Sequence, residues 1–472
     1  MQWLALHFPQ LPLDLLGRVE GAPVAVAEPR GGRPSVVLAN AEARREGVMP
    51  GLTVAGAWGL CARLQVRQRD PAGERAALER LAAWACQFSP QLALEPDALL
   101  LEVGRSRRLF GGLGPLLARV REGLAGLGVQ AVPFLAPTPE GALQLARAGE
   151  QGSAPDLGAL KERLARLPLH RLPLGERGHR VLRDAGLRTL GEVLALPRTG
   201  LARRFGTDLG DWLDRLLGMA PDPRPAFVPP EMYHGRLELA AEVERVEPLL
   251  FPARRLLGEL GGFLLGRQLG TQHLDWVLHH ADLPPTRFSL GLARLERDPG
   301  RFQALLRERL ERVALPAAVR EIELRVDSLA PLADLPPDML EGRVREQGEA
   351  LLERLQARLG PDAVKGLRLR ADHRPERAFG LCAPGETGAE LVFPERPLWL
   401  LAEPRTLSVR GGMPWWEGPL VLAGERERVE TGWWDGGGVA REYFTARTAR
   451  GERLWVYRDL VSGDWFLQGL FG

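Results

Sequence analysis

The stretch FSPQLALEPDALLLEVGRSRRLFGG, residues 88–112, decides the fold of this chain. Within it, LALEPDALLLEV consists of two apolar runs on either side of Pro96-Asp97, a pair that is typical of a turn. Aspartate is favoured at such a turn because its side chain hydrogen-bonds to nearby backbone groups. The stretch therefore predicts a β-hairpin with Asp97 at its tip.

Strands and helices alternate on both sides of this hairpin. Apolar runs predict strands at 3–8, 24–27 and 129–136. Helix-like patterns follow at 40–47, 71–87 and 116–127. Alternation of this kind over residues 1–155 predicts an α/β or α+β domain.

The segment 156–220 is predicted to be helical throughout. Residues 160–220 hold twelve basic and seven acidic side chains, a surplus that suits contact with a DNA backbone. The run AGLRTLGE (185–192) resembles a helix-hairpin-helix turn, whose backbone N–H groups can bind phosphate, although a plain corner between two helices fits equally well. The residues expected near a phosphate are Gly186, Gly191, Arg203 and Arg204.

A proline-rich tether, residues 221–235, leads to two further regions. Residues 236–335 alternate between helix-like and strand-like patterns and hold fourteen arginines against fifteen acidic residues, which counts against tight DNA binding there. The extension 336–472 contains seven of the twelve tryptophans and alternates like strands near its end. These tryptophans either pack a small β-rich module or form an aromatic surface for a partner or for single-stranded bases.

The bulk composition is that of an ordinary globular protein, with 45% hydrophobic and 26% charged residues. No apolar run is long enough to span a bilayer, and the N-terminus lacks the features of a signal peptide. Cys61, Cys86 and Cys382 show no metal-ligand spacing, so we expect a cytoplasmic protein without a zinc site. A net charge of +2 argues against a protein that holds nucleic acid by charge alone.

Several motifs resemble those of the Y-family translesion DNA polymerases over residues 1–335. They are GAPVAVAE (21–28), VVLANAEARREGVMPGL (36–52), the hairpin stretch 88–112, and AGLRTLGEV (185–193) with Arg203-Arg204-Phe205-Gly206. The resemblance implies an α+β multidomain fold: Y-family-like palm and fingers (the UmuC-type domain, 1–155), a helical thumb (156–220) and an α/β little-finger module (236–335). A β-rich C-terminal extension would follow it.

The resemblance also shows which catalytic carboxylates are missing. The family takes one aspartate from the first strand and an aspartate–glutamate pair from the hairpin, to hold two Mg²⁺ ions. Here those positions hold His7, Asp97 and Ala98, so only Asp97 remains, as a vestige. An imidazole does not suit a hard cation, and we expect no metal and no cofactor. The alternative, an active polymerase with Mg²⁺, would need Glu95 or Glu102 to join Asp97.

The nucleotide contacts implied by the resemblance are weakened as well. Ala41 replaces the tyrosine of the run that contacts the triphosphate, while Arg44 matches and would be a vestigial nucleotide contact. The lysine-bearing run after the third palm strand reads APTPEGALQLAR (136–147) and holds no lysine. This consistent decay favours loss of polymerase activity.

Together with the long extension, the pattern resembles the ImuB-type Y-family homologues of bacterial inducible-mutagenesis cassettes. Runs in the extension that fit this group include DHRPERAF (372–379), ETGWWDGG (430–437) and RLWVYRD (453–459). The resemblance implies a non-catalytic adaptor at the nucleoid. Its partners would be DNA (weakly), the β sliding clamp, a RecA-like accessory protein and an error-prone replicative-type polymerase α subunit.

The clamp-binding peptide expected in such a protein is poorly matched. Past the third region, ADLPPDMLEGR (333–343) offers only Met339 and Leu340, and the chain end offers Gln468, Leu470 and Phe471. Both are weak candidates for clamp binding. Three functions thus remain open: an adaptor, a divergent active translesion polymerase, and a pure damaged-DNA-binding module, which the near-neutral charge disfavours.

Overall fold

The computed structural model describes residues 1–16, 21–205, 207–332, 351–352, 354–356, 358–360, 363–384, 386 and 394–471. The chain divides into two units, Met1–Arg358 and Leu359–Gly472. Each unit is described by itself.

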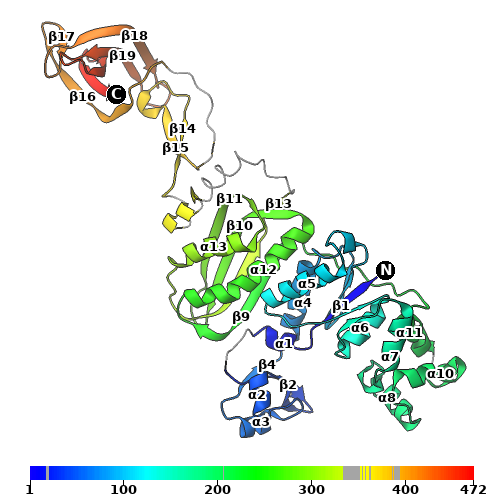
Figure 1. Ribbon diagram of the computed structural model, residues 1–472. Coiled ribbons are helices and arrows are strands. Elements are labelled where there is room, and N and C mark those ends of the chain that lie inside the picture. The colour runs from blue at the N-terminus through cyan, green and yellow to red at the C-terminus, as the bar shows by residue number, and fades with distance from the viewer. Residues whose placement is uncertain are drawn as a thin grey trace. The chain divides into compact units, whose positions relative to one another are not determined.

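A five-stranded sheet, called the palm-like sheet below, forms the centre of the first unit (Figure 1). Its order is β5 (Leu92–Leu94), β6 (Ala98–Glu102), β1 (Trp3–His7), β7 (Val132–Ala136) and β8 (Gly152–Ser153). Strands β5 and β6 pair antiparallel with Leu94 opposite Leu99, and Glu95 N–H donates to the carbonyl of Ala98 at 2.9 Å. The predicted hairpin with Asp97 at its tip is therefore present.

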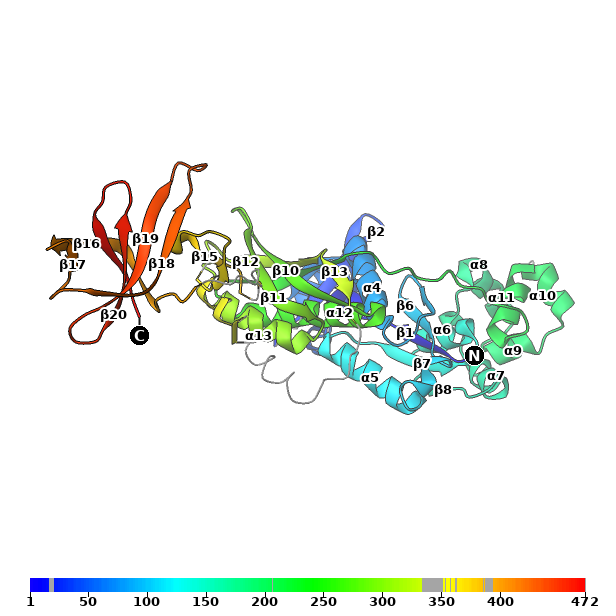
Figure 2. The same ribbon diagram turned by 90° about the horizontal axis from the view of Figure 1, so that it is seen from above.

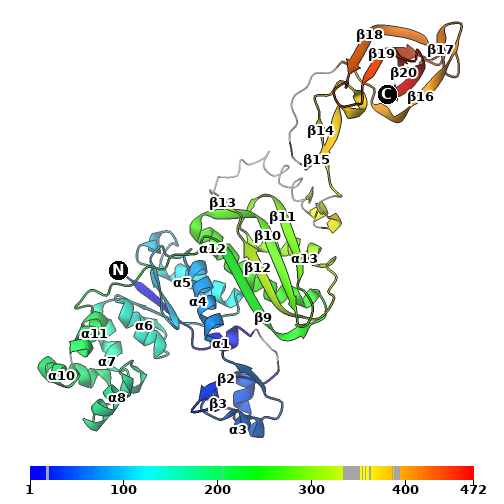
Figure 3. The same cartoon turned by 180° about the vertical axis from the view of Figure 1, so that it is seen from behind.

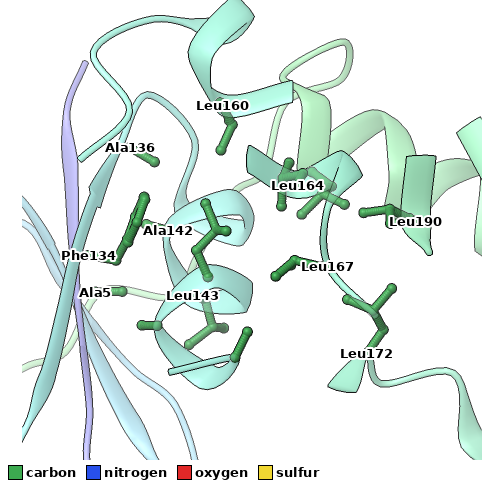
Figure 4. Packing of buried hydrophobic residues seen from close by; sticks show 14 of the residues in the cluster. Ala5, Phe134, Ala136, Ala142, Leu143, Leu160, Leu164, Leu167, Leu172 and Leu190 are labelled. Atoms are coloured by element: carbon green, nitrogen blue, oxygen red, sulfur yellow. The ribbon is translucent and has the colours of Figure 1, made fainter. Parts of the chain in front are cut away.

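Successive side chains of β1 enter two different cores, as the two-residue period of a strand requires. Leu4 and Leu6 pack with helices α4 (Pro71–Ala85) and α5 (Leu113–Gly126). Ala5 lies on the opposite face, with Phe134 of β7, against α6 (Pro139–Arg147). Figure 4 shows this second core continuing into the helical segment through Leu164 and neighbouring leucines.

A small three-stranded sheet lies beside the palm-like sheet, in the order β3-β2-β4. The short helix α1 (Leu11–Asp14) precedes this sheet. The sheet and its two helices are β2 (Val24–Arg30), β3 (Arg33–Ala39), α2 (Ala41–Arg45), α3 (Val54–Leu60) and β4 (Gln65–Gln68). Asn40 begins α2, because its side chain accepts a hydrogen bond from Ala43 N–H. This cap fixes the orientation of the helix that carries Arg44.

Within the described residues, five α-helices, besides the short 3₁₀ helix Leu169–Arg171, make up the segment that the sequence predicted to be helical. They are α7 (Leu157–Ala165), α8 (Gly175–Asp184), α9 (Leu190–Leu194), α10 (Arg198–Phe205) and α11 (Thr207–Leu217). Their leucines bury against α6, so the segment shares its core with the palm-like sheet.

A second mixed region follows, with a sheet of order β11-β10-β12-β9 to which β13 pairs through β10. Its elements are β9 (Tyr233–Val243), α12 (Leu250–Arg267), β10 (Leu269–His280), β11 (Thr286–Glu296), α13 (Pro299–Leu310), β12 (Val319–Val326) and β13 (Leu329–Pro331). Helices α12 and α13 cover one face of this sheet, where Trp276 and Phe302 are fully buried (Figure 2). The other face carries polar side chains.

Helix α12 also packs tightly along α4 of the palm-like region (Figures 1 and 3). Glycines permit the close approach: a Cβ on Gly262 would collide with the indole of Trp84. Arg80 of α4 pairs at 2.8 Å with Glu259 of α12, whose side chain is fully buried. The Tyr233 hydroxyl, 3.3 Å away, also donates to that carboxylate. A charge buried this deeply requires such partners, so the two regions are joined by a specific contact.

The second unit is rich in strands, as the sequence predicted. A two-stranded sheet of β14 (Gly366–Leu369) and β15 (Phe379–Cys382) precedes a six-stranded antiparallel sheet of order β17-β16-β21-β20-β19-β18. The latter comprises β16 (Trp399–Arg410), β17 (Met413–Trp415), β18 (Val421–Thr431), β19 (Val439–Arg447), β20 (Arg453–Asp459) and β21 (Trp465–Leu470). None of the described helices combines the length and apolar character that crossing a membrane requires.

Candidate functional site

His7, Asp97 and Ala98, which the resemblance assigns to catalytic positions, lie together at one end of the palm-like sheet. His7 is the last residue of β1 and pairs with Ala98, the first residue of β6. Phe8 N–H donates to the carbonyl of Asp97 at 2.9 Å, which holds the hairpin tip against the end of β1. The imidazole Nε2 of His7 lies 3.3 Å from Oδ2 of Asp97.

The carboxylate of Asp97 is bound by Arg147, which sequence reasoning did not single out. Arg147 is the last residue of α6, and its Nε lies 3.1 Å from both carboxylate oxygens of Asp97. Its Nη2 lies 2.5 Å from Oδ1. Burial by itself would raise the pKa of Asp97, but the hydrogen bonds from His7 and Arg147 outweigh it and hold this pKa well below its usual value. The only signal in the sequence was a basic residue at the end of the run 136–147.

The two glutamates considered as substitutes are engaged elsewhere. Glu95 binds Arg224 of the tether, with Nη1 2.7 Å from Oε1. Glu102 is buried at the opposite end of β6, paired with Trp3, and accepts hydrogen bonds from Gln2 N–H and Gly104 N–H. Four residues of strand, about 13 Å, separate the pairing positions of Glu102 and His7. Neither glutamate side chain completes a metal site with Asp97.

Arg224 holds a second acidic cluster next to this one. Besides Glu95 it binds Asp222 and Glu140, the latter being a buried residue of α6. Glu140 also accepts hydrogen bonds from Trp212 Nε1 at 2.6 Å and from Gln144 Nε2 at 2.9 Å. Burial raises the pKa of Glu140, but these donors, with Arg224, lower it below its usual value. A side chain of the tether, Arg224, thus lies against α6, within the run 136–147.

Within the described residues, one group of three side chains could bind a metal ion: His279, Glu321 and Glu323, whose ligand atoms lie within 4.8 Å of one another. This group lies far along the chain from Asp97. It belongs to the polar face of the second sheet. Nε2 of His279 lies 2.7 Å from one oxygen of Glu323, and Nε2 of His234 lies 2.8 Å from the other. The guanidinium of Arg325 also binds Glu323.

The charges on this face neutralise one another. Arg236 pairs with Glu321 just as Arg325 pairs with Glu323. Burial raises the pKa of Glu323, but the three donors around it lower that pKa to about 2. An arginine that is already paired with a carboxylate binds phosphate poorly. These ion pairs and the acidic excess counted over residues 236–335 therefore both count against tight DNA binding by this region.

In the helical segment, the turn after Gly186 was predicted to bind phosphate through its backbone N–H groups. Gly186 follows α8 with φ +79°, a left-handed conformation that favours glycine. The backbone N–H groups of Arg188 and Thr189 donate to the carboxylate of Glu192, at 2.6 and 3.0 Å. The chain's own glutamate therefore takes the donors that a phosphate would use at this turn.

Gly191 is accounted for by packing. A Cβ there would lie 2.9 Å from the carbonyl oxygen of Ala165, so α9 could not approach α7.

Arg203 and Arg204, at the end of α10, are exposed, and neither forms an ion pair with any residue that the structure describes. A groove next to the Gly186 turn adds three arginines that the sequence prediction did not name, Arg180, Arg183 and Arg188, and its lining also includes Glu176. The role of these residues at a phosphate remains a prediction.

Arg44, the expected nucleotide contact, is exposed on α2. Its Nε donates to the carbonyl of Ala39 at 2.8 Å. The guanidinium thus braces the turn between β3 and α2.

The two clamp-binding candidates differ in what the structure says of them. Met339 and Leu340 lie outside the described residues. Gln468 lies in β21 and is 1% exposed; its Oε1 accepts a hydrogen bond from the Tyr443 hydroxyl, and its Nε2 donates to Glu376. Leu470 pairs with Trp399 and Leu454 on the two neighbouring strands. Phe471 lies under the guanidinium of Arg453, 4.4 Å from the ring centre. Residues 468–471 therefore pair and pack within the sheet and are not free to bind the clamp as an extended peptide, which argues against a clamp-binding peptide at this position.

Comparisons with known proteins agree with this architecture. Residues 10–133 match the model of the impB/mucB/samB family, named IMS. Protein ImuB of Caulobacter vibrioides is 29% identical over 457 residues, which cover 90% of this chain and 100% of that protein, with the same figures for two strains. The resemblance drawn from the sequence is confirmed, as is the α+β multidomain fold class with its β-rich C-terminal region.

Solved structures of lower similarity include an insertion ternary complex of Dbh DNA polymerase, with 18% identity and a TM-score of 0.41. DinB from Sulfolobus solfataricus has 18% identity and a TM-score of 0.39. Each comparison covers 70% of this chain and 100% of the other.

Proposed function

We propose that this homologue of ImuB, with its impB/mucB/samB domain, is a non-catalytic adaptor in DNA-damage-induced translesion mutagenesis. It joins the sliding clamp, a RecA-like accessory protein and an error-prone polymerase α subunit at damaged DNA in the cytoplasm. The partner polymerase carries out the synthesis.

The observation that carries the non-catalytic part of this proposal is the pairing of Asp97 with Arg147. Two-metal nucleotidyl transfer needs several carboxylates around ions about 3.5–4 Å apart. Here one carboxylate remains, and a guanidinium and an imidazole already satisfy it. A bound Mg²⁺ would have to displace Arg147 and would gain a single anionic ligand, while Mg²⁺ demands near-octahedral oxygen coordination.

The surroundings of this site support the same conclusion. Helix α6 carries the carboxylate of Glu140 beside this site, and the guanidinium of Arg224 is bound to three carboxylates, those of Glu95, Glu140 and Asp222. Arg44 is exposed and donates from Nε to the carbonyl of Ala39. Of these two arginines, Arg224 is therefore already neutralised by its carboxylates, and Arg44 supplies a single cation.

The adaptor's contact with DNA is weak and uses the helical segment. Arg203, Arg204 and the groove at 168–188 supply exposed cations. The second sheet pairs its own charges and adds little. Specific recruitment therefore depends on protein partners.

A primer-extension assay tests the non-catalytic claim. The full chain, at micromolar concentration, is incubated with primed template, all four dNTPs and either Mg²⁺ or Mn²⁺, next to Asp97→Ala. We expect no incorporation by either protein. Extension that disappears in Asp97→Ala would overturn the proposal and show a divergent active polymerase. Binding of the three purified partners, measured separately, tests the adaptor role.

A further inference from the structure

A histidine and two glutamates meet on the polar face of the second sheet. His279 lies on β10, and Glu321 and Glu323 lie on the neighbouring strand β12, where a spacing of two residues places both glutamates on one face. His279 pairs directly with Glu321 and lies diagonally from Glu323. The ligand atoms of the three side chains therefore form a triangle across two strands, within 4.8 Å of one another.

The distances between these atoms are close to those that a tetrahedral zinc site requires. Imidazole and carboxylate ligands lie about 2.0–2.2 Å from Zn²⁺, which separates two ligand atoms of a tetrahedron by about 3.3–3.6 Å. Nε2 of His279 lies 3.6 Å from Oε1 of Glu321 and 2.7 Å from Oε2 of Glu323. An ion would replace the hydrogen bond between His279 and Glu323, and the imidazole would move by less than about 1 Å.

The carboxylate of Glu323 is held so that one of its oxygens faces His279. The other oxygen, Oε1, is bound by Nε2 of His234 at 2.8 Å and by the guanidinium of Arg325. Hydrogen bonds of this kind orient a metal-binding carboxylate, and their loss weakens metal binding by about 10–100-fold. His234 and Arg325 thus fix the position of Oε2 without occupying it.

The mixture of donors favours zinc over other divalent ions. One imidazole nitrogen and two carboxylate oxygens suit a borderline ion, whereas Mg²⁺ and Ca²⁺ prefer oxygen ligands alone. Among the divalent first-row transition metals, Mn²⁺ binds a given set of ligands most weakly. A water molecule would complete the tetrahedron, as it does in zinc sites that have three protein ligands.

Arg236 of β9 is the group that competes with an ion for Glu321. The guanidinium of Arg236 pairs with Glu321, but the arginine side chain is 58% exposed. An exposed ion pair contributes little to stability, so Arg236 can turn into water when an ion binds. Glu321 and Arg236 also line a cavity of about 650 Å³ together with residues of β4 and α4, which gives an ion room to approach.

We propose that His279, Glu321 and Glu323 form a zinc-binding site, with His234 as a positioning residue. The site links β10 to β12 and goes beyond the proposed adaptor function, on which it does not depend. The sequence analysis, which expected no metal, did not find it because 44 positions separate His279 from Glu323.

The test uses the full chain, treated with EDTA and then desalted at neutral pH. Isothermal titration calorimetry with zinc chloride measures affinity and stoichiometry, and the visible absorption of bound Co²⁺ reports a tetrahedral site. We expect one zinc ion per chain and a loss of affinity of at least about 100-fold in His279→Ala, which removes a ligand. His273→Ala is the matched control, because His273 is exposed on the same strand about 20 Å away and should keep the wild-type affinity.

Two further variants separate the ligands from their neighbours. His234→Ala should lower the affinity by about 10-fold, because the carboxylate of Glu323 loses a group that orients it. Arg236→Gln should raise the affinity by up to about 5-fold, because it removes the competitor for Glu321. Both side chains are 58% exposed, so we expect both variants to fold.

The other results would overturn the proposal. A wild-type chain that binds no zinc has no such site, and equal affinity in His279→Ala places the ion elsewhere on the chain. A lower affinity in Arg236→Gln would show that the guanidinium supports binding instead of competing with it. Circular dichroism checks the fold of His279→Ala, and if this variant unfolds, the opposite changes expected in His234→Ala and Arg236→Gln decide the question.

Discussion

The guanidinium of Arg147 binds the carboxylate of Asp97 at the tip of the palm hairpin, with Nη2 2.5 Å from Oδ1. The two residues are 50 positions apart in the sequence and meet because α6 packs across the face of the sheet that carries Ala5 and Ala98. The carboxylate that the resemblance assigns to a catalytic position is thus neutralised from within the chain.

Rebuilding the carboxylates should create a metal site. In His7→Asp/Ala98→Glu/Arg147→Ala, three carboxylates converge and the competing guanidinium is gone, so we expect Mn²⁺ binding that the wild-type chain lacks. Electron paramagnetic resonance of Mn²⁺ measures it directly. Arg147→Ala alone is the control and should stay without bound ion. Circular dichroism must show that the variant with a glutamate at the buried position 98 folds. Mn²⁺ bound at the palm of the wild-type chain would contradict the prediction.

Glu323 should make the stability of the first unit depend on acid pH. Its pKa falls from 4.5 to about 2 on folding, so its stabilisation is present above pH 4.5 and is lost as the pH falls towards 2. At pH 3.5, one unit below the unfolded pKa, the loss is about 1.4 kcal/mol. Urea unfolding at pH 7 and pH 3.5 should show this loss in the wild-type chain and not in Glu323→Gln.

Glu238→Gln is the matched control on the neighbouring strand β9, where Glu238 is exposed. It should keep the wild-type dependence on pH. An identical pH dependence in Glu323→Gln would show that the buried carboxylate does not carry the effect.

Gly262→Ala should destabilise the contact between α4 and α12. The added methyl group meets Trp84 and Gln87, and overpacking of this kind costs about 1–3 kcal/mol. Gly210→Ala, in the interior of α11 with no atom within 4 Å of the added Cβ, should instead stabilise the chain by about 0.5–1 kcal/mol. Equilibrium unfolding compares the two, and equal effects would speak against the glycine contact.

Arg203→Ala/Arg204→Ala should weaken DNA binding and reduce its dependence on salt. Each phosphate contact contributes about 0.9 to the slope of log K against log salt on duplex DNA, so the slope should fall by about 2. Fluorescence anisotropy over a salt series measures it. Arg198→Ala on the same helix should leave the slope unchanged, because Arg198 is held by Asp214 at 2.6 Å. An unaltered slope in the double variant would remove these arginines from the DNA surface.

The aromatic residues of the extension show where sequence patterns reach their limit. Strand-like alternation predicted a β-rich module, and Trp455, 3% exposed between two strands, packs inside it as expected. Trp433 and Trp434 are equally apolar, yet they stand in water. Periodicity identifies residues that suit a core. The exposure of Trp433 and Trp434 depends instead on the conformation of their loop, in which Asp435 binds the distant Arg374.

The sequence by itself determined the alternation of strands and helices, the hairpin at Pro96-Asp97, and the presence of His7 and Ala98 at two positions where the resemblance expects carboxylates. These depend on residue identity and on local periodicity, both of which are properties of neighbouring residues. Only the tertiary structure decided that Arg147 binds Asp97 across 50 positions and that Arg224 reaches Glu140 across 84 positions. Side chains pair according to which backbone segments packing brings within a few ångströms, and no short-range pattern encodes that distance.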